Sequence, residues 1–517
     1  MSTPTSSLYA PREPIFPRRV TGVFRRLKWA ILIVTLGIYY LTHWIRWDRG
    51  PNLPDQAVLV DMAGRRFYFF WIEIWPHEFY FVAGLLIMAG LGLFLFTSAL
   101  GRVWCGYTCP QTVWTDLFIL VERWIEGDRN KRVRLHHAKW DLHKWSLRLT
   151  KWAVWLVIAV ATGGAWVFYF ADAPTLLPDL LSFSAHPAAY ITIGILTMTT
   201  FVFGGFAREQ ICIYACPWPR IQAAMMDPDT ITVAYRDWRG EPRGKGNVRK
   251  RDRAQAEKAE REAQAAGPGA ARYTATPYPS KALQVGGAPQ LVAQTQEHGD
   301  CIDCMACVNV CPMGIDIRDG QQMECITCAL CIDACDDVMA KIGKPRGLID
   351  YFALSDEAAE RAGEAPKSIW RHVFRPRTLL YTAMWSLIGV GLVYALFVRS
   401  DIELTVSAIR NPTFVVQSDG TVRNIYDVRL RNKLGDDRLL HLSLRSDETL
   451  RIELEGRDGL LTVPVPADTT VLQRVYVNAR PQDAAATQHS TDLRLWVEDL
   501  ETGERASRST TFNGRVQ

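Results

Sequence analysis

The chain has 517 residues, of which 48 % are hydrophobic, and a formal net charge of +5. A chain of this length predicts several domains rather than one, and so small a net charge gives no indication of nucleic-acid binding. None of the 12 cysteines lies after Cys335, so the remainder of the chain contains no disulfide.

Five long apolar runs predict membrane-spanning helices, because each approaches the ~20 residues that cross a bilayer as a helix. Basic residues precede the first run, which lacks a small-residue cleavage site, so we expect a retained anchor rather than a removed signal peptide. Buried soluble helices are the alternative for the shorter runs, but five such runs in one chain favour a membrane bundle. The runs are Trp29–Ile45, Phe79–Leu100, Trp152–Ala171, Ala188–Phe206 and Thr378–Val398.

The loop charges predict the orientation of these helices. Positions 102–151 hold ten Lys or Arg, whereas positions 172–187 hold none. The positive-inside rule therefore places residues 1–28, the 102–151 loop and the 207–377 segment in the cytoplasm. Five crossings would then leave residues 400–517 in the periplasm, with all cysteines on or near the reduced side.

Two cysteine quartets with the same spacing follow an Ala- and charge-rich linker at 248–270. Each quartet reads Cys-x2-Cys-x2-Cys-x3-Cys, and the second repeats the first at an offset of 24 residues. In bacterial ferredoxins, three close thiolates hold one cubane and the fourth reaches the other cubane. We therefore predict a 2[4Fe–4S] ferredoxin-like domain at about 290–345 with crossed ligands. One cluster would be held by Cys301, Cys304, Cys307 and Cys335, and the other by Cys325, Cys328, Cys331 and Cys311.

Structural zinc and a disulfide framework are the alternatives for these cysteines. Zinc sites commonly pair two CxxC elements across a longer gap, so the twin quartets favour iron–sulfur clusters. One departure from the bacterial pattern is Asp336, which follows the last cysteine where proline is usual.

The tail after residue 400 alternates apolar and polar positions in about seven short stretches separated by turn signals. This pattern predicts an immunoglobulin-like β-sandwich. The tail shows no catalytic motif, so we expect it to contact a partner or a second copy of the chain. The stretches are Asp401–Ala408, Thr413–Val416, Ile425–Asn432, Leu439–Leu444, Leu450–Glu455, Thr470–Asn478 and Asp492–Val497.

The four other cysteines form two matching hexapeptides, Cys105–Pro110 and Cys212–Pro217, each reading Cys-x-Tyr-x-Cys-Pro. Each follows a pair of predicted membrane helices and an upstream arginine, Arg102 or Arg208, which indicates an internal repeat. On a helical end, cysteines at i and i+4 would share one face. The thiols of Cys105, Cys109, Cys212 and Cys216 could bind Cu(I), hold a redox cofactor, or cycle between dithiol and disulfide. The alternative is that they are small buried hydrophobes.

Three histidines lie at predicted outer ends of the membrane helices: His43, His77 and His186. They could form an external metal or haem site, or meet a quinone. An ordinary interfacial role is the alternative, since no helical spacing pairs them. His136, His137 and His143 lie in the basic loop, where we expect them to be solvated.

In its helices, paired CxxxCP motifs, ferredoxin quartets and outer sandwich, the whole chain resembles the family of bacterial cytochrome c oxidase accessory proteins known as CcoG, RdxA or FixG. The most specific stretches are Trp104–Trp114, Met226–Arg239 and Gly299–Asp350. The membrane motifs alone also resemble the quinol-oxidising ferredoxin-type subunits of periplasmic nitrate reductase systems.

The resemblance implies an inner-membrane protein that reduces Cu(II) to Cu(I) during assembly of cbb3-type cytochrome oxidase. It also implies copper as substrate or transient ligand, and copper chaperones and oxidase assembly factors as partners; a homodimer is a further possibility. Two other functions remain open at this point, an electron carrier that exchanges electrons with quinone and a non-catalytic assembly scaffold. We expect the domains to be 1–28 (tail), 29–206 (four helices), 207–377 (cytoplasmic segment), 378–398 (fifth helix) and 400–517 (sandwich).

Overall fold

The computed structural model describes residues 14–50, 53–244, 299–457 and 459–515. The predicted linker at 248–270 and residues 1–13 of the predicted N-terminal segment 1–28 lie outside these ranges. Packing divides the chain into two units. The first comprises Met1–Leu41, Leu85–Val167 and Ser182–Ser386, and the second comprises Thr42–Gly84, Phe168–Leu181 and Leu387–Gln517. The short segments 42–84 and 168–181 thus group with the tail.

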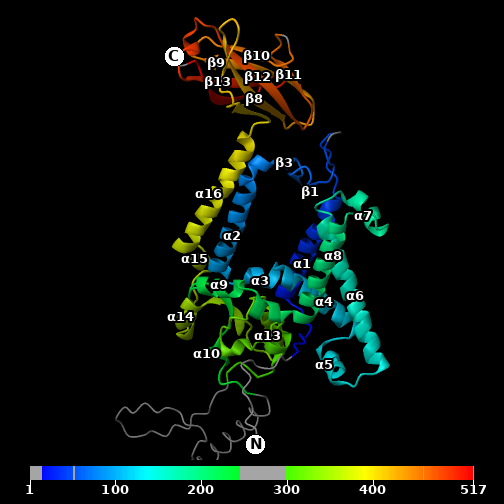
Figure 1. Cartoon of the computed structure of the whole chain (residues 1–517). Helices are drawn as coiled ribbons and strands as arrows, with labels where there is room; N and C mark the ends of the chain where they lie inside the picture. Colours follow the sequence, from blue (N-terminus) through cyan, green and yellow to red (C-terminus); the bar gives the residue numbers. More distant parts are fainter. Residues whose placement is uncertain (1–13, 51–52, 245–298, 458, 516–517) are drawn as a thin grey trace, which may run out of the picture. The chain divides into compact units, whose positions relative to one another are not determined.

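Four helices in the described ranges are long and apolar enough to cross a membrane (Figure 1). Three come from predicted runs with nearly the predicted bounds, and α6 begins earlier than predicted, within the basic loop. They are α2 (Tyr80–Leu100), α6 (Leu142–Val167), the continuous helix Pro187–Ala207 made of α8 (Pro187–Thr200) and the π-helix η3 (Phe201–Ala207), and α16 (Pro376–Val398).

The other helices of the first unit are shorter. They are α1 (Val23–Leu41), α3 (Val103–Tyr107), α4 (Pro110–Ile125), α5 (Arg129–His137), η4 (Ile211–Ala215), α9 (Trp218–Met225), α10 (Asp237–Gly240), α12 (Ala306–Val310), η5 (Ile317–Asp319), α13 (Leu330–Lys341), η6 (Leu354–Asp356), α14 (Glu357–Arg361) and α15 (Ile369–Val373).

The run Trp29–Ile45, predicted to be a fifth membrane helix, is not among these four. Helix α1 covers part of this run, but its first turns carry Arg25 and Lys28, which are buried and both pair with Asp116 of α4 at 2.9 and 3.8 Å. Arg25, Arg26 and Lys28 leave α1 too short an uncharged stretch to count among the helices that are long and apolar enough to cross a membrane. The described residues therefore contain four candidate spans, not five.

A two-stranded antiparallel sheet closes the cysteine-rich segment of the first unit. Strand β4 (Ile231–Tyr235) pairs with β5 (Ile349–Ala353), so residues before and after the cysteines are joined. Val233 and Leu348 are almost fully buried against Cys301, Cys307 and Cys335. Burial of each such side chain contributes roughly 1.5–3 kcal/mol, so the sheet holds the cluster-binding segment in one place.

The second unit begins with a small antiparallel sheet that the sequence analysis did not anticipate. It has the order β1–β2–β3, formed by β1 (Val58–Asp61), β2 (Arg66–Phe69) and β3 (Ile72–Ile74). The unit also contains the short helices η1 (Thr42–Trp44), η2 (Pro76–Glu78), α7 (Ala173–Leu181) and η7 (Ala484–Ala486).

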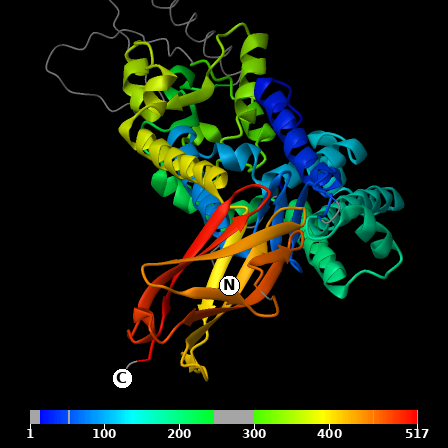
Figure 2. The ribbon, with the colours of Figure 1, turned by 90° about the horizontal axis from the view of Figure 1, so that it is seen from above.

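The tail is a two-sheet sandwich, which confirms the predicted immunoglobulin-like fold class. One sheet has the order β10–β12–β8–β6 with β7 paired to β8, and the other has the order β11–β9–β13–β14. The strands, yellow to red in Figures 1 and 2, form one compact body. Their bounds are β6 Ile402–Ala408, β7 Val415–Val416, β8 Val422–Asn432, β9 Arg438–Ser446, β10 Arg451–Leu454, β11 Thr462–Val465, β12 Thr470–Ala479, β13 Thr491–Asp499 and β14 Arg505–Phe512.

All seven predicted stretches contain strands, and two strands were missed. Strand β11 has proline in its middle, a residue that argues against a strand in sequence. Strand β14 is largely polar and exposed at the sheet edge, so it lacks the apolar alternation of β8. Its buried end, Phe512, belongs to the core with Tyr426 and Leu430.

Candidate electron-transfer site

The four cysteines predicted to hold the first cluster line one pocket of the first unit. Cys301, Cys307 and Cys335 are buried, whereas Cys304 is exposed. The pocket wall is completed by Tyr235, Ile302, Met305, Ala306, Arg318, Met339, Leu348 and Ile349.

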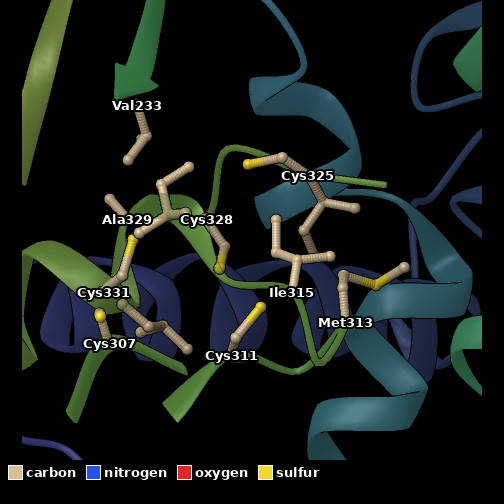
Figure 3. Close-up of a pocket in the computed structure, with 12 residues that line it drawn as sticks. Val233, Cys307, Cys311, Met313, Ile315, Cys325, Cys328, Ala329 and Cys331 are labelled. Atoms are coloured by element: carbon tan, nitrogen blue, oxygen red, sulfur yellow. The ribbon is translucent and has the colours of Figure 1, made fainter. Parts of the chain in front are cut away.

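The four cysteines predicted to hold the second cluster line another pocket (Figure 3). Cys311 and Cys328 come from different quartets, and in Figure 3 their sulfurs point toward one another across the cavity. Cys325 and Cys331 complete the set, and the remaining lining is Val233, Cys307, Met313, Ile315, Ile317, Ile326, Ala329 and Leu330.

The two quartets also repeat in backbone conformation. Asp303 and Met305 of the first quartet have positive φ (51° and 58°), and so do Thr327 and Ala329 of the second (53° and 58°). Such conformations cost of order 1–3 kcal/mol at non-glycine residues and persist only where the surroundings impose them. The same distortion at the same offset of 24 residues therefore shows two equivalent loops, each wound around its own pocket.

The residues of both pockets fit a [4Fe–4S] cluster, whose usual ligands are four cysteine thiolates. Burial is the largest cause that raises the pKa of Cys311 to about 12 and holds that of Cys331 well above its ordinary value. Buried thiols of this kind stay protonated unless a metal binds them, and metal coordination deprotonates a thiol outright. Each predicted ligand set lines one of the two pockets, and Cys307 of the first set also lines the second pocket; ligation itself stays a prediction.

The first hexapeptide does not form the continuous helical face that its spacing predicted. Cys105 lies inside α3, but Cys109 precedes α4 with φ −57° and ψ 128°, outside both helices. The physical reason is Pro110, because proline disfavours helical conformation in the residue before it. The i, i+4 argument was therefore wrong for this pair.

The second hexapeptide repeats the break. Cys212 lies in the π-helix η4, and Cys216 is extended before Pro217, with φ −79° and ψ 122°. Each repeat thus presents one cysteine from a short helix and one from the bend that follows it.

The four hexapeptide thiols lie in one neighbourhood. Cys212 packs against the core cluster that contains Cys105. Burial, followed by Cys109, raises the pKa of Cys105 to about 12, and burial, followed by Cys109 and Cys216, raises that of Cys212 to about 11. In the described part of the chain no three His, Cys, Asp or Glu side chains are placed to hold a single metal ion. The predicted copper site is therefore not preformed, although Cys109 and Cys216 are partly exposed.

The first hexapeptide lies directly against the loop of the second pocket. A Cβ added to Gly106 would lie 2.6 Å from the Ile326 carbonyl oxygen and 3.0 Å from the Cα of Cys328. Tyr107 donates a hydrogen bond from its hydroxyl to the Cys328 carbonyl at 3.2 Å. Cys105 and Cys212 share an apolar cluster with Cys328, Cys311 and Cys331.

The two upstream arginines, equivalent in sequence, have different partners. Arg102 donates to the carbonyl oxygens of Met323 and Cys325, the latter at 3.0 Å. Arg208 instead pairs with the buried Glu122 of α4. The repeat is therefore symmetric in sequence but not in its contacts with the cluster-binding segment.

Two residues of this site carried no sequence signal. Gln222 of α9 accepts from Arg102 at 3.4 Å and from the Cys105 thiol at 3.2 Å. Tyr351 of β5 donates to the Thr327 carbonyl at 2.8 Å. Both form hydrogen bonds with residues far away in the sequence, and neither belongs to a motif with a known chemical role.

The three histidines predicted at the outer ends of the membrane helices lie on three different elements of the structure. His43 is buried in η1 against Trp44, Phe168 and Tyr169, and burial lowers its pKa to about 4. His186 is exposed and its Nδ1 accepts from the Ala188 amide as the cap of α8. His77 lies in η2.

Three family models match the chain. A "4Fe-4S dicluster domain" matches residues 207–273 and 278–354, and a "4Fe-4S binding domain" matches residues 81–132, which include Cys105 and Cys109. An "IG-like fold at C-terminal of FixG" matches residues 392–515. A crystal structure of a FixG-related protein from Vibrio parahaemolyticus aligns with 23 % of this chain and 100 % of its own, at 15 % identity and a TM-score of 0.20, too weakly to argue from.

Curated relatives match almost the whole chain. Protein RdxB of Cereibacter sphaeroides is 64 % identical over 99 % of this chain and 98 % of its own. Protein RdxA of the same organism is 59 % identical over 98 % of both chains. Nitrogen fixation protein FixG of Rhizobium meliloti is 50 % identical over 98 % of this chain and 94 % of its own. With two 4Fe-4S binding domains and relatives of this similarity, the chain is an iron–sulfur electron-transfer protein that belongs to the RdxA/FixG family.

Proposed function

We propose that this protein reduces Cu(II) to Cu(I), with Cys105, Cys109, Cys212 and Cys216 forming the site where copper is met. The observation that carries the proposal is that Cys105 and Cys212 belong to the same apolar cluster as Cys328, Cys311 and Cys331. This proximity puts soft thiol ligands beside the pocket lined by the four cysteines predicted to hold the second cluster. Two [4Fe–4S] clusters, when bound, supply one-electron transfer.

The chemistry of the thiols suits copper reduction. Thiolates select Cu(I) over harder ions, so ligands of this kind stabilise the product more than the substrate and favour the uptake of one electron by each Cu(II). Cys109 and Cys216 are only half-buried, so an incoming ion can reach them, whereas Cys105 is buried beside the cluster-binding loop. No three such ligands in the described residues are placed around one point, so the cysteine side chains would move toward the ion on binding.

The proposal extends to the protein's setting. We place it in the bacterial inner membrane with the cysteines on the cytoplasmic side and the sandwich in the periplasm, on the loop charges. Its partners would be copper chaperones and assembly factors of cbb3-type oxidase, with a low-potential one-electron donor in the cytoplasm.

The test uses two double variants, Cys105→Ser with Cys109→Ser, and Cys212→Ser with Cys216→Ser, in the full-length protein. We expect both to keep their iron content and cluster EPR signals, and to lose Cu(II) reduction about tenfold or more because serine is a poor Cu(I) ligand. The matched control is Tyr214→Phe, an exposed position of the second hexapeptide.

Two outcomes would contradict this proposal. Wild-type copper reduction in both double variants would show that copper is met elsewhere. Loss of iron from the double variants would mean that these thiols hold iron rather than copper.

A further inference from the structure

Arg102, Gly106 and Tyr107 contact one loop of the ferredoxin-like segment, Cys325–Cys331. Arg102 donates to the loop from both backbone and side chain: its amide donates to the Thr327 hydroxyl at 3.0 Å, and its guanidinium donates to the Cys325 carbonyl at 3.0 Å. Tyr107 donates to the Cys328 carbonyl at 3.2 Å. These contacts lie along the loop that carries three of the four cysteines predicted to hold the second cluster.

Glycine at position 106 allows the α3 backbone to approach the Cys325–Cys331 loop this closely. The Cβ of any other residue would lie 2.6 Å from the Ile326 carbonyl oxygen, closer than real Cβ contacts. Because the obstructing atoms are backbone, a larger side chain could not be accommodated by a rotamer change. The α3 backbone therefore lies directly on the cluster-binding loop.

The positive charge of Arg102 is not neutralised by any carboxylate among its described hydrogen-bond partners. Its side chain is buried, and its described polar partners are carbonyl oxygens and the Gln222 amide oxygen rather than carboxylates. Glu324 attracts it at longer range. Burial is the largest influence on its pKa, which it lowers, but arginine stays protonated in proteins.

The first pocket has a different electrostatic surrounding. Its arginine, Arg318, is paired with two carboxylates, Asp303 at 2.7 Å and Asp316 at 2.6 Å, so its positive charge is neutralised locally. Cys304 of this pocket is exposed. The first pocket thus opens toward solvent, while the second lies under α3.

We propose that Arg102, Gly106 and Tyr107 form a clamp that fixes the Cys325–Cys331 loop beside the hexapeptide thiols and gives the cluster held there the higher reduction potential. Net charge and hydrogen bonding are established determinants of cluster potential, and an unneutralised buried cation stabilises the added electron. Electrons would then enter at the exposed first cluster and leave from the second. The direction of flow rests on the proposed function, whereas the order of potentials does not.

The test is an EPR-monitored redox titration of the full-length protein with both clusters assembled. Cys335→Ser and Cys311→Ser first assign each signal to its cluster. We expect Arg102→Gln to lower the potential of the second cluster by about 59 mV, a tenfold change in a one-electron equilibrium, without moving the first. Arg102→Lys, which keeps the charge, should restore most of it. The matched control Arg318→Gln should move only the first cluster.

A second variant keeps the inference testable if Arg102→Gln fails to assemble its clusters. Glu324→Gln removes a negative charge from the same loop, so we expect the potential of the second cluster to rise while the first stays constant. Equal potentials in the wild type, or no response of the second cluster to either charge change, would overturn the clamp. If the protein does not reduce Cu(II), the proposed function is wrong, but this titration still decides the order of the two potentials.

Discussion

Glu73 of β3 is buried in the second unit, and its surroundings there change the pKa of its carboxyl group. Its neighbours are Arg66 at 3.3 Å, the Asp468 carboxylate, which pairs with the same arginine, and Arg399, which donates to its backbone carbonyl. Burial is the largest cause, ahead of repulsion from Asp468, that raises the pKa of Glu73 from 4.5 to about 7. One arginine shared by two carboxylates cannot keep both charged at low cost.

This raised pKa predicts a pH-dependent stability. A folded pKa above the unfolded value means that the folded state holds the proton between pH 4.5 and about 7. The stabilisation is fully present below pH 4.5 and is lost as the pH rises through about 7. For a shift of this size the loss in the free energy of unfolding is roughly 3 kcal/mol.

Calorimetry of the detergent-solubilised chain at pH 5 and pH 8 measures this effect. We expect the unfolding transition that includes the sandwich to occur at a lower temperature at pH 8 than at pH 5. Glu73→Gln should remove that difference, because glutamine is neutral at both pH values. Glu453→Gln, at an exposed pair with Arg423, is the control. An unchanged pH response in Glu73→Gln would show that another group is responsible.

At the scale of elements, helix α1 begins on the ferredoxin-like segment. The Phe24 and Arg25 amides donate to the Asp333 carboxylate of α13 at 3.3 and 2.7 Å. Free amides at a helix N-terminus carry a partial positive charge, so a carboxylate there satisfies donors and complements the helix dipole. Asp333 therefore acts as the cap of α1 while standing two residues from Cys335.

This cap predicts that α1 and the cluster-binding segment are stabilised together. Asp333→Ala should cost about 1–2 kcal/mol, whereas Asp333→Asn keeps an acceptor and should cost less. Hydrogen exchange in the first turn of α1, followed by mass spectrometry, reports the loss directly. As a control, Asp337→Ala removes the exposed pair with Lys341 on the same helix; an equal effect of Asp337→Ala would argue against a capping role.

At the scale of the whole molecule, the topology depends on whether α1 crosses the membrane. Four candidate spans would return the chain to its starting side, whereas a periplasmic sandwich and a cytoplasmic N-terminus require an odd number. The buried Arg25 and Lys28, held by Asp116, would lie at the cytoplasmic end of such a crossing, where the positive-inside rule places basic residues.

Reporter fusions decide between the two topologies. We expect alkaline phosphatase fused after Gln517 to be active, because residues 400–517 are proposed to be periplasmic, and a fusion within α5 to be inactive. A cytoplasmic reporter at the same two positions should give the reverse pattern. Phosphatase activity only at α5, or at neither position, would contradict five crossings.

The sequence by itself determined the cluster chemistry, the fold class and most of the strands. Ligand spacing such as Cys325-x2-Cys328 is a local property, and so are the length of an apolar run and the alternation along β8, so each can be read without knowing what the segment packs against. The crossed grouping of Cys311 with Cys325, Cys328 and Cys331 was also predicted from spacing, and these four line one pocket together with Cys307.

The tertiary structure alone decided which pocket lies against the membrane motifs. Arg102 and Arg208 are equivalent in sequence, yet one holds the Cys325 carbonyl and the other Glu122, because their partners come from segments far away in the chain. Strand β14 was missed for the same reason: its place depends on pairing with β13 rather than on its own apolar pattern. Contacts of this kind are settled by packing between distant segments, and local spacing carries no information about them.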